Sequence, residues 1–315
     1  MKSTGLTIEG DNARNNGGSQ IYQSNPNASI LDLFGKINAN GRREADQRIQ
    51  NLFFRSLGGG IKAIKGDHPN TTSFSIGSLM IINCYFLDIN SGYCIDVESI
   101  EQLAGNTFDF CEGGGIKGGN LRAVNNVFFG QGKGAIVIDT DRIPSDGINE
   151  IEYSISQITG NSFYGNGTDS NLVPVPQRSS IGIIGSKTAF NINVSSNIFV
   201  ALTDGSGAFG ISSDSAMKNC NISNNTFSQL RGEAIRIVDL EYSIIESNNF
   251  NRIGNSPSAT HIIELPNCRK SIVSKNTFFG CGGLKNIYLN GNDNIINYNI
   301  EDTPRITITG QNNVI

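Results

Sequence analysis

The chain has 315 residues, of which 37% are hydrophobic and 17% are charged, and its formal net charge is −4. This length allows one large domain or two ordinary ones, and the many Ile, Val and Phe residues exclude a disordered chain. The acidic balance argues against a nucleic-acid partner, and the lack of an apolar run of about eighteen residues argues against membrane insertion. The opening segment, MKSTGLTIEG, has no apolar core of the signal-peptide type.

A short motif of Asn, any residue and Phe recurs along the chain. It starts at Asn51, Asn106, Asn126, Asn161, Asn197, Asn225, Asn248 and Asn276, and Asn83-Cys84-Tyr85 is a variant. Successive starts are 20 to 36 residues apart. A Gly-flanked, β-branched strand follows each motif, as at 92–97 and 133–139, and another strand precedes it, as at 79–82. Each repeat therefore offers three short strands joined by turns rich in Gly, Asn and Ser.

Short strands at this period, with no segment of helical periodicity, predict a parallel β-solenoid. A single coil cannot bury its apolar face, but coils stacked about 4.8 Å apart share one core. We expect roughly a dozen coils in a rod on the order of 60 Å long. We also expect the motif Asn to adopt the left-handed conformation and form an amide ladder, with the Phe two residues later stacked inside.

The six cysteines are spread along the chain, and no two of them form a CxxC pair. The chain has only two histidines, His68 and His261, which are far apart in sequence. We therefore expect no zinc site and no other cofactor, and we expect free, buried thiols, since a chain of this length does not need disulfides. Cys111 and Cys281 each lie five residues after a motif Asn, which suggests a buried stacking position.

The segments GLTIEGDN (5–12), NPNASILDLFG (25–35) and IQNLFFRS (49–56) resemble the first coils of the right-handed parallel β-helix of the pectate-lyase-like superfamily, as found in phage tailspike depolymerases. The resemblance implies an all-β fold, a single-stranded right-handed parallel β-helix, in one domain over residues 1–315. It also implies that this domain is part of a longer tailspike-like chain. The implied assembly is a homotrimer, placed in the virion tail or another extracellular setting.

Function in a solenoid is expected in the loops of one face and in the outward residues of one sheet. Two insertions, 140–152 and 164–180, belong to neighbouring coils and are predicted to wall a groove. Inward Ile residues fix the alternation of the Gly-flanked strands, so that polar side chains gather on their outer face. The outward positions directly after these Ile residues are Asp96, Lys117, Val137, Ser212 and Arg236. The strand ends add further charged groups near the same face.

Glycoside hydrolysis uses two carboxyl groups, which are about 6.5–9.5 Å apart in inverting enzymes. Asp139 and Asp214 are two coils, or about 9.6 Å, apart in our alignment, and we predict them as the acid and base, with Asp141 as a substitute. The predicted substrate-binding residues are Glu98, Lys117, Arg142, Arg236, Asp239 and Tyr164. Of these, Arg142 and Arg236 would hold an acidic sugar.

The leading hypothesis is an endoglycosidase that depolymerises a bacterial capsule or O-antigen. A polysaccharide lyase on the same fold stays open, with Lys117, Arg142, Arg236 and Tyr288 as outward candidates for the base and the group that neutralises a uronate. The third hypothesis is a non-catalytic adhesin or tail-fibre segment that binds glycan, which needs only a groove.

Overall fold

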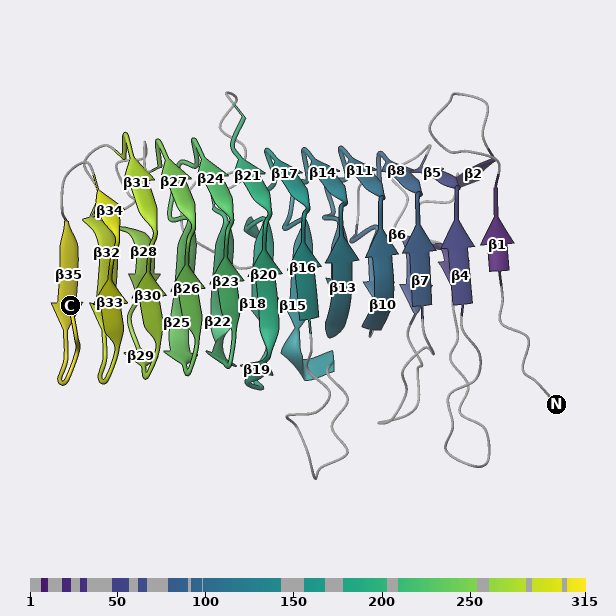
Figure 1. The fold of residues 1–315 in the computed structure, drawn as a ribbon. Helices are drawn as coiled ribbons and strands as arrows, with labels where there is room; N and C mark the ends of the chain where they lie inside the picture. Colours follow the sequence, from purple (N-terminus) through teal and green to yellow (C-terminus); the bar gives the residue numbers. More distant parts are fainter. Residues whose placement is uncertain are drawn as a thin grey trace, which may run out of the picture.

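The structure is a computed structural model, and it describes residues 7–10, 19–23, 29–32, 47–56, 62–66, 79–89, 92–97, 99–142, 156–167, 178–202, 209–253, 261–281, 285–301 and 305–315. The chain winds into stacked coils, each of which contributes one strand to each of three parallel sheets (Figure 1). We call these sheets A, B and C, in the order in which the chain enters them. The first coil, with β1, and the last coil, with β35, lie at opposite ends of the rod.

Sheet A consists of the strands that precede the Asn motif. In stacking order these are β1 (Thr7–Glu9), β4 (Gln47–Gln50), β7 (Leu79–Ile82), β10 (Ser99–Ala104), β13 (Asn120–Val124), β16 (Ser156–Thr159), β20 (Ile192–Ser195), β23 (Asn221–Ser223), β26 (Ile244–Glu246), β30 (Ile272–Ser274) and β33 (Ile295–Asn297). All neighbouring strands pair in parallel.

Sheet B consists of the strands that carry the motif Phe. In stacking order these are β2 (Gln20–Gln23), β5 (Phe53–Ser56), β8 (Tyr85–Leu87), β11 (Thr107–Asp109), β14 (Val127–Phe129), β17 (Ser162–Tyr164), β21 (Ile198–Val200), β24 (Thr226–Ser228), β27 (Asn249–Asn251), β31 (Thr277–Phe279) and β34 (Ile300–Glu301).

Sheet C consists of the Gly-flanked strands. In stacking order these are β3 (Ser29–Asp32), β6 (Lys62–Gly66), β9 (Ile95–Val97), β12 (Ile116–Gly118), β15 (Ile136–Asp139), β18 (Ile181–Ile184), β22 (Ile211–Lys218), β25 (Ile235–Glu241), β28 (His261–Leu265), β32 (Lys285–Asn290) and β35 (Ile306–Thr309). Two short strands, β19 (Ala189–Phe190) and β29 (Cys268–Arg269), pair with the ends of β22 and β25. A 3-10 turn, η1 (Thr140–Arg142), follows β15.

The predicted fold class is confirmed: the protein is an all-β parallel β-helix, and the three strand families of the sequence repeat are its three sheets. Sheets A and B each contain eleven strands among the described residues, which agrees with the expected number of coils. No helix in the described part of the chain has the length and apolar character needed to cross a membrane.

A column of stacked aromatic rings fills the interior behind sheet B. It contains Phe54, Phe86, Phe108, Phe128, Phe163, Phe199, Phe227, Phe250 and Phe278. Successive ring centroids are 4.6 to 5.1 Å apart and the rings are within 11° of parallel. This spacing is the strand separation within a sheet, so the stack follows from placing one Phe at the same position of nine successive coils. The predicted inward Phe is therefore confirmed.

Beside this column runs the predicted amide ladder, formed by Asn106, Asn126, Asn161, Asn197, Asn225, Asn248, Asn276 and Asn299. In each rung, the Nδ2 atom and the backbone N–H both donate to Oδ1 of the next Asn, over 2.9 to 3.1 Å. The second Nδ2 hydrogen of Asn161 bonds to the carbonyl of Ala123 at 3.0 Å. The ladder thus satisfies polar groups that would otherwise be buried without partners.

The left-handed conformation falls on the residue before the ladder Asn, which corrects our expectation. Gly105, Asn125 and Ser196 have φ angles of 66°, 55° and 57°, whereas the ladder residues that follow them do not have positive φ. The turn needs one residue with left-handed backbone, whereas the ladder needs a side-chain amide that points into the rod. Two consecutive residues meet these two requirements. The sequence places Gly, Asn or Ser at the first position in six coils, and Lys275 and Tyr298 in the last two, with Asn at the second position throughout.

The two earliest motifs are displaced by one residue from the others, which is a second correction. Asn51 and Asn83 take the left-handed position, with φ angles of 57° and 53°. Leu52 and Cys84 then occupy the ladder position, and the inward rings are those at 54 and 86 rather than those at 53 and 85.

All six cysteines lie in the described part of the chain as thiols outside disulfides, as expected, and Cys281 is half-buried whereas the other five are buried. Burial raises the pKa of the Cys84, Cys220 and Cys268 thiols to about 12. These thiols are therefore protonated packing groups at neutral pH.

Candidate functional site

One side chain from each coil forms a row along the outer face of sheet C. In stacking order the described row contains Asp96, Lys117, Val137, Gly182, Ser212, Arg236, Glu264, Tyr288 and Thr307. The outward positions predicted at 96, 117, 137, 212 and 236 are in this row. Gly182, which lies in β18 between Val137 and Ser212, was not named among those positions.

Asp139 and Asp214 lie in a second outward row of the same sheet, two positions further along their strands. Asp139 pairs with Ile184 in the next coil, and Asp214 follows Ser213, the partner of Ile183, in the coil after that. The two aspartates are thus two coils apart, the separation from which we predicted them as a pair. A bulge between Ser213 and Ala216 follows directly and turns the strand end of β22.

The first charged group on this face, which we call the Arg142 cluster, contains Asp96, Lys117, Asp139 and Arg142. The Asp139 carboxylate lies 3.0 Å from Lys117 Nζ and 3.3 Å from Arg142 Nε, and Arg142 also pairs with Asp96. Both carboxylate side chains are largely buried, at 7% exposed for Asp96 and 13% for Asp139. The charges of the two carboxylates balance those of Lys117 and Arg142, so this cluster is neutral overall.

The second charged group, which we call the Arg236 cluster, is more open. Arg236 Nη1 lies 3.5 Å from Asp214 Oδ1, and its Nε lies 3.3 Å from Glu264 Oε2. The Asp214 side chain is 58% exposed, and that of Glu264 is 22% exposed. Tyr288 is the next residue in the row, and its ring packs against His261 with centroids 4.9 Å apart. Two carboxylates, a guanidinium group and an aromatic ring therefore meet on one face.

The outward residues between the two clusters have small side chains and are buried. Val137 and Ser212 are 0% and 1% exposed, and Gly182 is buried, although all three point outward from sheet C. The Asp214 side chain, at 58% exposed, is therefore more accessible than the Asp139 side chain, at 13% exposed. The acidic band expected from the sequence exists, but it consists of two clusters that differ in exposure.

Asp141 has a local structural partner. Its Oδ1 accepts hydrogen bonds from the backbone N–H and the hydroxyl of Ser186, at 2.8 and 2.7 Å. These bonds hold the pKa of Asp141 below its usual value of 3.8. They link the turn after β15 to the turn after β18, and they give this carboxylate a role in joining neighbouring coils.

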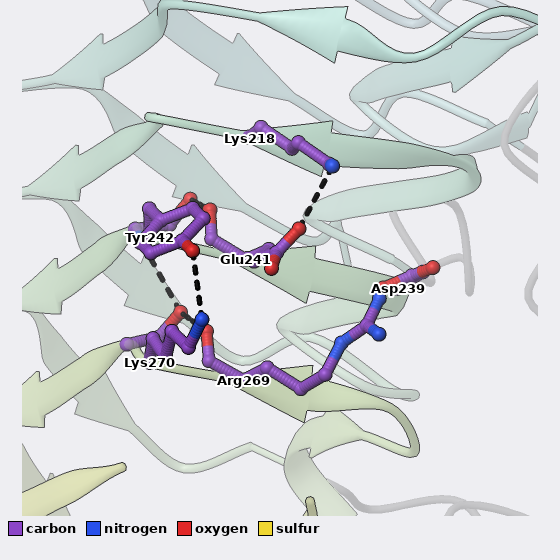
Figure 2. A network of polar contacts seen from close by, with 8 residues as sticks. Lys218, Asp239, Glu241, Tyr242, Arg269 and Lys270 are labelled. Carbon is purple, nitrogen blue, oxygen red and sulfur yellow. Dashed lines mark hydrogen bonds and ion pairs between the residues drawn. The ribbon is translucent and has the colours of Figure 1, made fainter. Parts of the chain in front are cut away.

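A third polar group lies where sheet C turns toward sheet A, and we call it the corner network. It consists of Lys218, Asp239, Glu241, Tyr242, Arg269 and Lys270 (Figure 2). Lys218 Nζ lies 2.8 Å from Glu241 Oε2, and Arg269 Nη2 lies 3.3 Å from Asp239 Oδ1. We predicted that Asp239 binds substrate. In the structure it is ion-paired with Arg269 near the end of β25, three residues beyond Arg236.

Tyr164 lies on a different face from the other predicted residues. It points outward from sheet B, in register with Phe129 and Val200. Glu98 and most of both predicted insertions, 143–152 and 168–177, lie outside the described residues. The predicted groove between these insertions is likewise not described.

Two charged residues of the clusters were missing from the predicted site. Asp96 was identified as outward but was not selected, and Glu264 was not considered. The signal for Glu264 was present, because it follows Ile263, which pairs with the inward Ile235. The rule that placed Arg236 outward, applied to the strand HIIEL, gives Glu264. Within the described residues, no three His, Cys, Asp or Glu side chains are grouped so as to hold a metal ion.

Comparison with known proteins adds a likeness of fold. No protein-family model and no curated protein matches this sequence. Among solved structures, the chain is similar to tailspike protein 3 of bacteriophage CBA120, with a TM-score of 0.49 and 10% sequence identity. The match covers 92% of this chain and 48% of the tailspike, so the chain spans about half of that protein's length. The three parallel sheets of the chain itself define it as a parallel β-helix protein.

Proposed function

We propose that this protein is a tailspike-like endoglycosidase that hydrolyses a bacterial surface polysaccharide, a capsule or an O-antigen, on the outer face of sheet C. The observation that carries the proposal is the Arg236 cluster, in which two accessible carboxylates flank one guanidinium group next to a tyrosine ring. Glycoside hydrolases need two carboxyl groups and a surface that holds sugar rings.

Asp214 is the common member of two possible catalytic pairs. Its partner is either Asp139, two coils toward the N-terminus in the same row, or Glu264, two coils toward the C-terminus. The two contacts of Arg236 keep the Asp214 and Glu264 oxygens within about 9 Å of each other, a range that includes retaining and inverting separations. In a pair with Asp139, which is ion-paired with Lys117 and Arg142, we assign Asp139 the role of base and Asp214 the role of acid.

The proposed activity is tested by incubating the purified protein with a panel of capsular and O-antigen polysaccharides and analysing the products. We expect one polysaccharide to be shortened, with a saturated reducing sugar at every new end. Unsaturated ends that absorb in the ultraviolet would replace hydrolysis with lyase chemistry. Binding without cleavage would replace the enzyme with a glycan-binding adhesin or tail-fibre segment.

The proposed assembly is a homotrimer in a virion tail, and one surface supports self-association. On sheet A, the outward residues Ile244, Ile272, Ile295 and Val314 follow one another in register over the last coils. Ile244, Ile295 and Val314 are 36%, 38% and 59% exposed. A continuous aliphatic stripe of this kind is typical of an interaction surface, because isolated domains seldom leave one uncovered.

Light scattering coupled to size-exclusion chromatography tests this assembly. We expect three times the chain mass of 33.8 kDa for the wild type, and the monomer mass for a variant with Ile244→Lys and Ile295→Lys. Asn249→Lys, on the outer face of sheet B, is the control and leaves the trimer intact. A monomeric wild type, or a trimeric double variant, contradicts the assignment.

A further inference from the structure

Two of the buried cysteines, Cys94 and Cys111, lie in neighbouring coils and contact each other. Cys94 directly precedes β9, and Cys111 follows β11, which belongs to the next coil. Both residues are 0% exposed, and their thiols form a hydrogen bond with each other. The pair lies in the interior of the rod and is therefore separate from the charged clusters on the outer face of sheet C.

The backbone brings the two cysteines together through a single glycine. The Gly114 N–H donates to the Cys111 carbonyl at 2.9 Å, and the Gly114 carbonyl accepts from the Cys94 N–H at 3.0 Å. Residues 111–114 therefore form a hydrogen-bonded turn, and the end of this turn pairs directly with Cys94. The pairing between the two coils thus holds Cys94 next to the turn that begins at Cys111.

Glycines at 113 and 114 let this turn approach the preceding coil closely. A Cβ atom at Gly113 would lie 2.0 Å from the Gly92 carbonyl oxygen, and a Cβ atom at Gly114 would lie 2.5 Å from the Tyr93 ring. Gly114 also has a φ angle of 108°, which residues with side chains rarely adopt. The contact between the two thiols is therefore set by closely packed backbone, and the short cysteine side chains add little freedom to it.

The partner of Cys94 differs from those of other cysteines in the rod. The thiols of Cys84 and Cys220 donate to the carbonyl oxygens of Ile82 and Lys218, at 3.4 and 3.2 Å. The Cys94 thiol instead meets a second thiol. Burial raises the pKa of Cys94, so this thiol stays protonated while the coils are closed. Two thiols in contact are the reduced form of a disulfide site.

We propose that Cys94 and Cys111 form a disulfide bond that joins the coil of β9 to the coil of β11 when the protein meets a low-molecular-weight disulfide such as oxidised glutathione. One protein thiol, as its thiolate, attacks the small disulfide and releases one glutathione thiol. The second protein thiol attacks the resulting mixed disulfide, releases the second glutathione thiol and completes the S–S bond. The protein pair loses two electrons and two protons, and the two glutathione molecules receive them.

The disulfide bond acts as a staple between two coils. It joins residues that are 17 positions apart (111 − 94), and it removes conformations from the unfolded chain, which stabilises the closed coils. Because both sulfurs are buried, exchange takes place while this part of the rod is open, and the finished bond is shielded from reductants once the coils close. The inference does not depend on glycan cleavage, since it concerns the interior of the rod.

Peptide mapping by mass spectrometry tests the bond. The folded chain is incubated with oxidised glutathione in guanidinium chloride just below its unfolding midpoint, returned to buffer, alkylated and digested without reduction. We expect a cross-linked peptide that joins Cys94 to Cys111, and an intact mass before alkylation that is lower by two hydrogens than that of the reduced protein. We also expect the unfolding midpoint of the oxidised protein to rise by about 0.3 M or more in guanidinium chloride.

Two variants separate this pair from the other cysteines. Ala135 occupies the position of Cys94 in a later coil, and Ser243 occupies the position of Cys220 in the next coil, so Cys94→Ala and Cys220→Ser both suit the fold. We expect Cys94→Ala to abolish the cross-link and the rise in midpoint, and Cys220→Ser to keep both. A wild type without the cross-linked peptide, a peptide that joins other cysteines in its place, or an unchanged midpoint in the cross-linked protein overturns the inference.

Discussion

Replacement of Asp214 by Asn is expected to lower the rate of polysaccharide cleavage by about 10²–10⁴-fold, the contribution of a general acid or base. The substitution keeps the size of the side chain and removes its ability to carry or accept the proton. Asp214 is exposed, and within the described part of the chain its ion pair is with Arg236, so the fold is expected to be unaffected. The release of new reducing ends, measured at saturating substrate, gives the effect directly.

Two further variants identify the partner of Asp214. If the pair is Asp139 and Asp214, then Asp139→Asn matches the loss while Glu264→Gln has a small effect; if the pair is Asp214 and Glu264, the order is reversed. Glu246→Gln is the control, because Glu246 is a carboxylate on the outer face of sheet A. An active Asp214→Asn enzyme would remove sheet C as the proposed catalytic face.

Phe163→Ala is expected to destabilise the folded protein by about 3–5 kcal/mol, the usual cost of emptying a buried aromatic site. Phe163 is 0% exposed, and its ring is stacked between Phe128 at 5.1 Å and Phe199 at 4.8 Å. Because each coil contacts only its neighbours, a cavity at this level weakens both adjacent interfaces in the rod. Unfolding in guanidinium chloride measures the change as a lower midpoint.

The matched control for this core substitution is Phe279→Ala. Phe279 is also on sheet B, but it points outward and is 60% exposed. We expect its loss to change the free energy of unfolding by no more than about 0.5 kcal/mol. Similar midpoints for the two variants would show that the inner column of rings does not hold the coils together.

The fold could be predicted because the same residue types recur at the same place in every coil. The inward Phe of nine successive coils, and the Asn two residues before it in seven of them, are visible without knowing the exact period. The displacement of the first two motifs was not visible, since Asn occurs at both the left-handed position and the ladder position, as in Asn125 and Asn126. Only the pairing of Phe54 with Phe86 separates the two positions there.

The site was predicted less completely because it depends on the register between coils. Strand alternation placed Lys117 and Arg236 outward correctly, and it gave the two-coil separation of Asp139 and Asp214. It did not show that the positions between them are covered, or that Arg236 reaches Glu264. The contact between Arg236 and Glu264 joins side chains in neighbouring coils that are 28 residues apart in the chain.

A crystal structure of the Asp214→Asn variant with a bound oligosaccharide tests the central claim most directly. The account predicts that sugar residues lie across the outer face of sheet C at β22, with a glycosidic oxygen next to residue 214. The second carboxylate, Asp139 on β15 or Glu264 on β28, lies on the other side of the bond. An oligosaccharide bound only on the outer face of sheet A or sheet B would contradict it.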